Sequence, residues 1–123
     1  MTSIRFAQLT DAQFQFLIES GELNGCGPKA KWLPVPDWIF TADCYRHDFN
    51  YWLGHTEADR YKADRQFYDA MWEDANNLPW YKRWAAKTMA WIYYRAVRVF
   101  AGKFFYYAEQ ERSLEDLEEL MNA

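Results

Sequence analysis

The chain repeats one helix-start signal three times: a Ser or Thr followed three residues later by an acidic or amide side chain. In this capping box, two side chains satisfy backbone N–H groups that the first helical turn leaves without partners. The pairs are Thr10 with Gln13, Thr56 with Asp59, and Ser113 with Asp116. They predict a helix ending near residue 20, a second ending near residue 75, and a short acidic helix at the carboxyl end.

Two more helices are predicted between these signals. Asp37 is a suitable N-cap for a helix over residues 38–53, which Gly54 ends. A long helical region is expected over residues 80–107, with a bend near Gly102. No segment reads as a strand, and no repeat or dividing linker is visible, so the sequence predicts an all-α fold in one domain, residues 1–123.

Length and composition favour a folded protein. A chain of 123 residues, half of them apolar and a fifth aromatic, buries roughly two thirds of its unfolded surface. Cations interrupt the most aromatic region, so we expect a peripheral rather than a transmembrane protein. The amino end shows no secretory signal. The location therefore stays open between the cytoplasm, a mature form whose leader was removed, and export by another route.

The segment DCYRHDFNYWLG, residues 43–54, places four reactive side chains on one helical face. Cys44, His47, Asp48 and Tyr51 follow one another at i, i+3, i+4 and i+7, which lie together on a helix. Such a face carries catalysis, metal binding or only packing. A histidine ordinarily titrates near pH 6.5, so it can accept a proton at physiological pH.

The loop NGCGPK precedes that helix. Gly25 and Gly27 allow positive φ angles, so the loop can turn backbone carbonyls inward. Calcium takes six to eight oxygen ligands and accepts carbonyls beside a carboxylate. Cys26 and Cys44 permit one intramolecular disulfide, which would fasten the loop one turn before His47. Whether it forms depends on the compartment, and the alternative is two small buried apolar residues.

Together these segments resemble the secreted phospholipase A2 superfamily, in particular its compact prokaryotic and fungal branch. The likeness consists of GCG in the loop, the helix CYRHDFNY, the helix ADRQFYDAM with an aspartate beside an arginine, and the later YYRAVRVF. The clear correspondence covers residues 24–71. It implies two antiparallel core helices that carry a His/Asp dyad, plus an N-terminal and a long C-terminal helix.

The resemblance implies a calcium-dependent enzyme that hydrolyses the sn-2 ester of glycerophospholipids at a membrane surface. His47 would be the general base for the attacking water, and Asp64 would orient its imidazole. Tyr51 would support Asp64, and the amide of Gly27 would help to stabilise the oxyanion. The calcium ligands would be the Asp48 carboxylate and the carbonyls of Gly25, Gly27 and Lys29.

Asp64 is also unusual when its neighbouring residues are considered without the family resemblance. It interrupts a mostly apolar stripe made of Tyr61, Phe67, Tyr68 and Met71. A carboxylate inside such a stripe needs a partner when buried, which His47 and Tyr51 would supply. The simpler interpretation is an aspartate on the rim of the stripe.

Charge is unevenly distributed over the carboxyl half. Residues 79–108 contain six basic residues and no acid, whereas residues 109–123, the acidic tail, contain six acids and Arg112. A basic aromatic segment can bind anionic lipid or nucleic acid, and the resemblance favours lipid and no nucleic acid. The tail could screen this segment or only keep the protein soluble.

The aromatic residues of the basic segment have two interpretations. One helical stripe indicates core packing, and its members are Tyr93, Val97, Phe100, Phe104 and Tyr107. A second group would suit a lipid interface, and it consists of Trp80, Trp84 and Trp91 with Lys82, Arg83 and Lys87.

Two alternatives to an active enzyme follow from the residues. Lys29 stands where the resembling family usually has a glycine, which favours a catalytically weak or inactive relative that binds lipid or a protein. The other alternative is a helical interaction module in which the His-Asp pair is incidental. In that case His47 should not face Asp64, and Cys26 should lie too far from Cys44 to bridge.

Overall fold

A computed structural model describes residues 2–25 and 37–123. The helices in chain order are η1 (Phe6–Gln8), α1 (Asp11–Glu19), η3 (Asp37–Phe40), α2 (Thr41–Leu53), α3 (Glu57–Asn76), α4 (Trp80–Phe100), η4 (Ala101–Phe104) and α5 (Leu114–Asn122). Over these described ranges no strand occurs, and the only β-type pairing is an isolated bridge between His55 and Tyr107. The predicted all-α fold class is confirmed over the described residues.

The three capping boxes lie where the sequence predicts them. The Thr10 hydroxyl accepts from the Gln13 amide at 3.1 Å, and the Gln13 side chain accepts from the Thr10 amide at 2.9 Å. Reciprocal boxes also open α3 and α5. The helix that carries His47 starts later than predicted, because a turn of 3-10 helix, η3, precedes α2.

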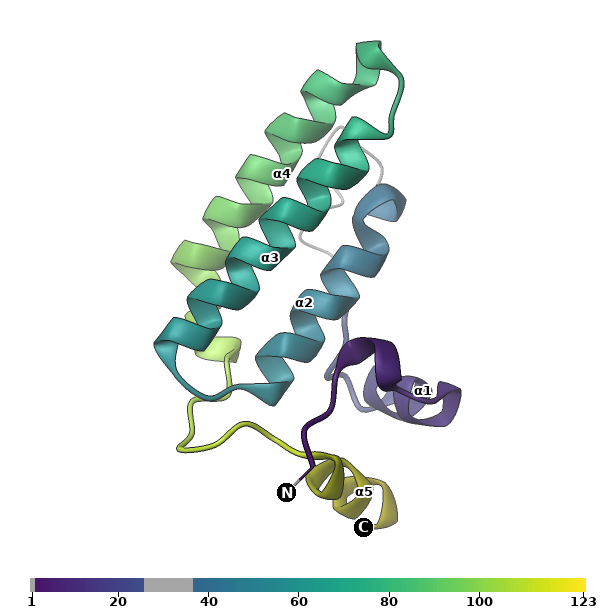
Figure 1. Ribbon diagram of the computed structural model, residues 1–123, viewed down its shortest axis with the longest axis vertical. Coiled ribbons are helices and arrows are strands. Elements are labelled where there is room, and N and C mark those ends of the chain that lie inside the picture. Colours follow the sequence, from purple (N-terminus) through teal and green to yellow (C-terminus); the bar gives the residue numbers. More distant parts are fainter. Residues whose placement is uncertain (1, 26–36) are drawn as a thin grey trace.

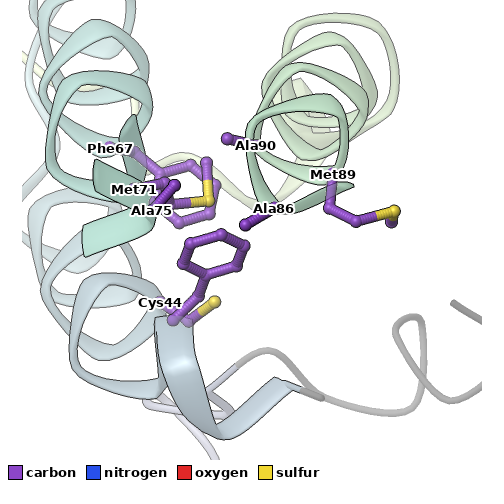
Figure 2. Close-up of a cluster of buried hydrophobic side chains, with 8 residues drawn as sticks. Cys44, Phe67, Met71, Ala75, Ala86, Met89 and Ala90 are labelled. Carbon is purple, nitrogen blue, oxygen red and sulfur yellow. The ribbon is translucent and has the colours of Figure 1, made fainter. Parts of the chain in front are cut away.

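The helices form two groups along the long axis (Figure 1). α3 and α4 make a long antiparallel hairpin, α2 lies along α3, and α1 and α5 lie together at the end that holds both chain termini. One buried cluster joins α2, α3 and α4 (Figure 2). A second cluster joins α1, α2 and α5 through side chains that include Leu17, Phe49 and Leu117. A third contains Tyr51 of α2 and Ala63 of α3. α2 is therefore packed on two sides, which fixes the orientation of the residues it carries.

Figure 2 shows the side chains that fill the contact between α3 and α4. Ala75 on α3 and Ala86 and Ala90 on α4 are fully buried between the helices, and Phe67 and Met71 fill the space beside them. Small side chains at a helix contact let the two backbones come together. Cys44 from α2 lies in the same cluster.

Gly54 ends α2 at a point where another segment crosses. Its φ is +72°, and a Cβ added there would lie 1.9 Å from the Tyr106 carbonyl oxygen. The next residue, His55, donates its amide to that same carbonyl at 2.9 Å, and its own carbonyl accepts from Ala108 at 3.0 Å. The segment after η4 thus pairs with the α2–α3 turn, and only glycine fits at the crossing.

That pairing corrects the predicted end of the long helix. α4 ends at Phe100 instead of continuing towards Tyr107, and η4 leads into the extended segment. The prediction that Phe100, Phe104 and Tyr107 belong to a core stripe is wrong, since all three are exposed. Tyr93 and Val97, which stay within α4, do pack against buried clusters.

Candidate active site

His47 on α2 faces Asp64 on α3. Because the two helices are antiparallel neighbours, His47 and Tyr51 on one meet Asp64 and Arg60 on the other. His47 Nε2 lies 2.7 Å from Asp64 Oδ1, and the Tyr51 hydroxyl donates to the same oxygen at 2.6 Å. The His47 residue is 6 % exposed and Asp64 is 0 % exposed. This contact argues against a module in which the His-Asp pair is incidental.

Two aromatic rings hold the imidazole of His47. The Phe67 ring stacks on it with centroids 4.4 Å apart, and the Tyr51 ring lies at 4.3 Å. With Nε2 directed at a carboxylate, the hydrogen-bond network assigns the ring proton of neutral His47 to Nε2. The nitrogen that can accept a proton is then Nδ1.

Arg98 on α4 completes the surroundings of Asp64. Its Nη1 donates to Asp64 Oδ2 at 2.7 Å, and its Nη2 donates to Glu57 Oε1 at 3.2 Å. The two oxygens of Asp64 are thus divided between His47 with Tyr51 and the guanidinium of Arg98. The sequence motif YYRAVRVF contains Arg98. Which residue of α3 Arg98 faces depends on how α3 and α4 are aligned, and local sequence patterns do not reveal that alignment.

A second arginine, Arg60, supports the pair from within α3. Its Nη1 lies 3.6 Å from Asp64 Oδ2 and donates to the Tyr51 hydroxyl at 3.2 Å and to the Val97 carbonyl at 3.1 Å. Its Nε donates to Glu57 Oε2 at 2.9 Å. Arg60 therefore ties α3 to α4 as well as supporting Tyr51.

The arginine beside Asp64 in sequence does not take part. Arg65 Nη2 lies 3.6 Å from Asp69 Oδ1, and its guanidinium stands over the rings of Tyr68 and Tyr94. Adjacent residues on a helix point in different directions, so the Asp-Arg dipeptide of the motif separates into a buried carboxylate and a surface cation.

The electrostatics keep Asp64 ionised. Burial raises the pKa of Asp64, but hydrogen bonds from His47, Tyr51 and Arg98 outweigh burial and leave that pKa below its ordinary value. Burial, with the bond to Asp64, raises the pKa of Tyr51, so its hydroxyl remains a donor. Hydrogen bonds from Arg60 and Tyr107 lower the pKa of Glu57 to about 2. The carboxylates of Asp64 and Glu57 thus pair with the guanidinium groups of Arg60 and Arg98.

Asp48, next to His47, points toward the glycine loop. Its Oδ2 accepts from the backbone amides of Asn24 at 2.9 Å and Gly25 at 2.8 Å. Gly25 has the positive φ that the sequence predicts, +69°. The start of the loop therefore lies at the Asp48 carboxylate.

The rest of the predicted loop site falls outside the described residues. Cys26, Gly27 and Lys29 belong to this part, so the disulfide, the oxyanion amide and two of the calcium ligands remain predictions. Cys44, the other predicted disulfide partner, is buried in α2.

A calcium ion fits the donor chemistry at Asp48. Within residues 2–25 and 37–123 no group of three or more His, Cys, Asp or Glu side chains forms a metal cluster. A site of one carboxylate and several backbone carbonyls is not such a cluster, and it suits a hard cation. Because two amides already bind Asp48 Oδ2, an ion held by both carboxylate oxygens would share Oδ2 with them.

A helical scaffold with a buried His-Asp pair between antiparallel helices is compatible with a hydrolase, and comparison with known proteins identifies the family. The family model described as prokaryotic phospholipase A2 matches residues 8–101, so the chain belongs to that family. The match spans α1 to α4 and supports lipid hydrolysis as the general activity. No curated protein and no solved structure matches the chain. Among the described helices, none is long and apolar enough to cross a membrane.

Proposed function

We propose that this chain is a calcium-dependent phospholipase A2 that hydrolyses the sn-2 ester of glycerophospholipids, with His47 as general base and Asp64 as its orienting carboxylate. The observation that supports the proposal best is the 2.7 Å contact between His47 Nε2 and the fully buried Asp64. It occurs in a chain of the matching family, on the two helices expected to carry the dyad.

The proposed reaction uses water as the nucleophile. Nδ1 of His47 takes a proton as the water oxygen attacks the ester carbonyl, and the Asp64 carboxylate stabilises the imidazolium that forms. When the carbon–oxygen bond to glycerol breaks, the imidazolium returns the proton to the leaving alkoxide. The products are a free fatty acid and a lysophospholipid. Tyr51 and Arg98 keep Asp64 ionised and oriented throughout.

Calcium would be held by the Asp48 carboxylate and by the carbonyls of Gly25, Gly27 and Lys29. Bound there, it would supply positive charge for the negative charge that develops on the ester carbonyl oxygen, together with the Gly27 amide. The hydrogen bonds that Asp48 accepts from the Asn24 and Gly25 amides support a loop folded against this carboxylate.

A disulfide between Cys26 and Cys44 is part of the proposal. It would join the glycine loop to α2 one turn before His47. Because Asp48 on the same helix already binds the start of the loop, the bridge would restrain that loop from a second point.

We also propose that residues 1–123 form one domain. The acidic tail lies beyond the family match, yet Leu117 is fully buried in the cluster with α1 and α2. Arg112 donates to the Trp52 carbonyl at 2.6 Å, and Thr2 donates its amide to Glu115 at 2.9 Å. Arg112 and Leu117 thus join the tail to α2, and Thr2 joins the amino end to the tail.

A catalytically weak, lipid-binding relative is the second candidate. Two observations favour it: Lys29 at a usual glycine position, and the two amides already on Asp48 Oδ2. Both would reduce calcium affinity.

Vesicles of a phospholipid labelled in its sn-2 acyl chain test the proposed function. We expect label in the free fatty acid when calcium is present and none when a chelator replaces it. Fatty-acid release at the same rate with and without the chelator would show that Asp48 and the loop take no part in the mechanism. Vesicle binding with no release under either condition would favour the second candidate.

A further inference from the structure

One face of the α3–α4 hairpin exposes an unusual amount of indole. Trp80, Trp84 and Trp91 on α4 are 80, 78 and 55 % exposed. Their spacing of four and seven residues puts them along one line of the helix. Tryptophan is usually largely buried in a folded domain, so a row of three exposed indoles calls for a partner.

The row borders a groove between α3 and α4 of about 320 Å³. Its lining residues are Tyr68, Trp72, Trp84, Lys87, Thr88 and Trp91. Lys87 is the only charged side chain among them, and its Nζ stands 4.5 Å from the centre of the Trp72 ring. The groove lies on a different helix face from Ala86 and Ala90, which are buried against α3 (Figure 2).

Cations accompany the exposed rings, and α4 contains no acid. Lys82 stands over the Tyr81 ring and Arg95 over the Trp91 ring, each at 5.9 Å. Each cation thus lies beside an aromatic ring that can reach the same surface.

The nearby acids of α3 are engaged elsewhere. Asp69 pairs with Arg65 at 3.6 Å, and Asp74 lies against Asp43 of α2, whose pKa the contact helps to raise. The acidic helix α5 lies at the opposite end of the molecule from the α3–α4 turn (Figure 1). The tail therefore does not screen the tryptophan row.

We propose that this surface, which we call the indole face (Trp72, Trp80, Trp84, Lys87 and Trp91), docks on an anionic phospholipid surface. Indole rings favour the boundary between headgroups and acyl chains. Lysine and arginine side chains beside them gain energy from lipid phosphates. The inference deepens the proposed function by naming the face that meets the membrane. Lipid binding by this face is argued from its own residues, and only the use of that binding for hydrolysis rests on the proposed function.

Sedimentation with vesicles in the presence of chelator tests the docking without hydrolysis. The full chain should bind vesicles that contain phosphatidylglycerol more tightly than pure phosphatidylcholine vesicles, and less tightly as salt rises. Removing two interfacial indoles in the Trp84→Ala/Trp91→Ala variant should weaken binding at least about 10-fold, because affinity scales with the apolar area inserted. Lys87→Gln should weaken it a few-fold, about 5-fold at low salt, on the anionic vesicles alone.

Leu120→Ala is the matched control, since Leu120 is an exposed apolar residue of α5 at the other end of the molecule. Its binding should equal that of the unmodified chain. An equal loss in this control and in the tryptophan variant, or no loss in either, would overturn the proposal. So would a dimer that becomes a monomer in the tryptophan variant while vesicle binding is unchanged, because the indole face would then be a contact between two copies.

Hydrolysis of a short-chain phospholipid below its aggregation concentration requires no docking on a membrane, so this assay tests the proposed function separately from the docking. The tryptophan variant should keep that activity and lose activity on anionic vesicles. If the chain hydrolyses neither substrate, the sedimentation result still decides whether the indole face binds lipid.

Discussion

Arg98 on α4 donates a hydrogen bond of 2.7 Å to Asp64 Oδ2, the carboxylate oxygen that His47 and Tyr51 do not use. The bond makes α4 part of the candidate active site, although the dyad itself stands on α2 and α3. It also stabilises a charge that would be costly inside the protein without a partner.

Replacing this guanidinium tests its positioning role. In Arg98→Met, Asp64 Oδ2 loses its strongest donor, and the positive charge nearest the dyad disappears. We expect kcat/KM to fall about 10-fold or more, as is typical when the group that orients a catalytic ligand is lost. The pKa of Asp64 should rise, because the hydrogen bond from Arg98 is one of the contacts that lower it. The acidic limb of the pH–rate profile should therefore move to higher pH.

Arg98→Lys and Arg65→Met complete the comparison. Lysine should restore the charge and part of the rate, but not the paired bonds to Asp64 and Glu57. Arg65→Met should behave as the unmodified chain, since Arg65 contacts Asp69 instead. An unchanged rate and pH profile in Arg98→Met would show that Arg98 is not a positioning residue.

The Tyr51 hydroxyl should stabilise the fold more than a typical surface group. Tyr51→Phe keeps the ring beside His47 but removes the donor to Asp64 and the acceptor for Arg60. We expect the free energy of unfolding to fall by about 1–3 kcal/mol, because buried charged partners lose a bond. Urea denaturation measures this change. Tyr61→Phe, at an exposed position, should leave the midpoint unaltered, and equal effects in the two variants would contradict the role given to Tyr51.

Asp43 makes stability depend on pH. It is buried near Asp74, and among the residues that the structure describes its Oδ2 meets no hydrogen-bond donor. Burial, the Asp74 contact and Glu73 raise the pKa of Asp43 to about 8, against a smaller opposing effect of Arg46. The folded state then binds more protons than the unfolded state between pH 4 and 8, so this group's contribution to stability falls as pH rises through that window.

Asp43→Asn should remove that dependence. An amide carries no charge and can donate to Asp74, so the variant should be more stable than the unmodified chain at pH 8 by about 1 kcal/mol or more. The difference should shrink towards pH 4. Thermal unfolding across this pH range measures it, and a constant difference between the two proteins would contradict the raised pKa.

Gly54 should tolerate no side chain. In Gly54→Ala the new methyl group would meet the Tyr106 carbonyl oxygen at 1.9 Å, in addition to the strain of a positive φ. Gly21→Ala is the control, since its φ is +85° but nothing lies within 4 Å of the added Cβ. We expect the control to cost about 1–2 kcal/mol of unfolding free energy and Gly54→Ala to cost clearly more. Equal costs would mean that the crossing segment can move away.

The sequence predicts those features that neighbouring residues determine. Thr10 and Ser113 cap their helices because a capping box closes within one turn. The predicted end of the long helix is wrong because residues 105–108 pair with the turn at His55, a contact between segments far apart in sequence. The aromatic period alone could not signal that pairing.

In the candidate site, too, the sequence predicts what neighbouring residues determine and misses contacts between distant segments. His47, Asp48 and Tyr51 share one helix, so their spacing is visible in the sequence, and the family resemblance supplied Asp64. Arg98 was missed because its contact with Asp64 depends on how α4 is aligned along α3. Arg65, the neighbour of Asp64 in the motif ADRQFYDAM, lies outside the site and contacts Asp69, because adjacent residues on a helix point in different directions.

The most direct test of the central proposal compares the two histidines of the chain in one assay of fatty-acid release. His47→Asn removes the proposed base, whereas His55→Asn changes a residue that bonds the Ala108 carbonyl outside the site. We expect His47→Asn to lower the rate by about 10²–10⁴-fold with its helical content preserved, and His55→Asn to keep most of the activity. Undiminished fatty-acid release by folded His47→Asn would contradict the mechanism.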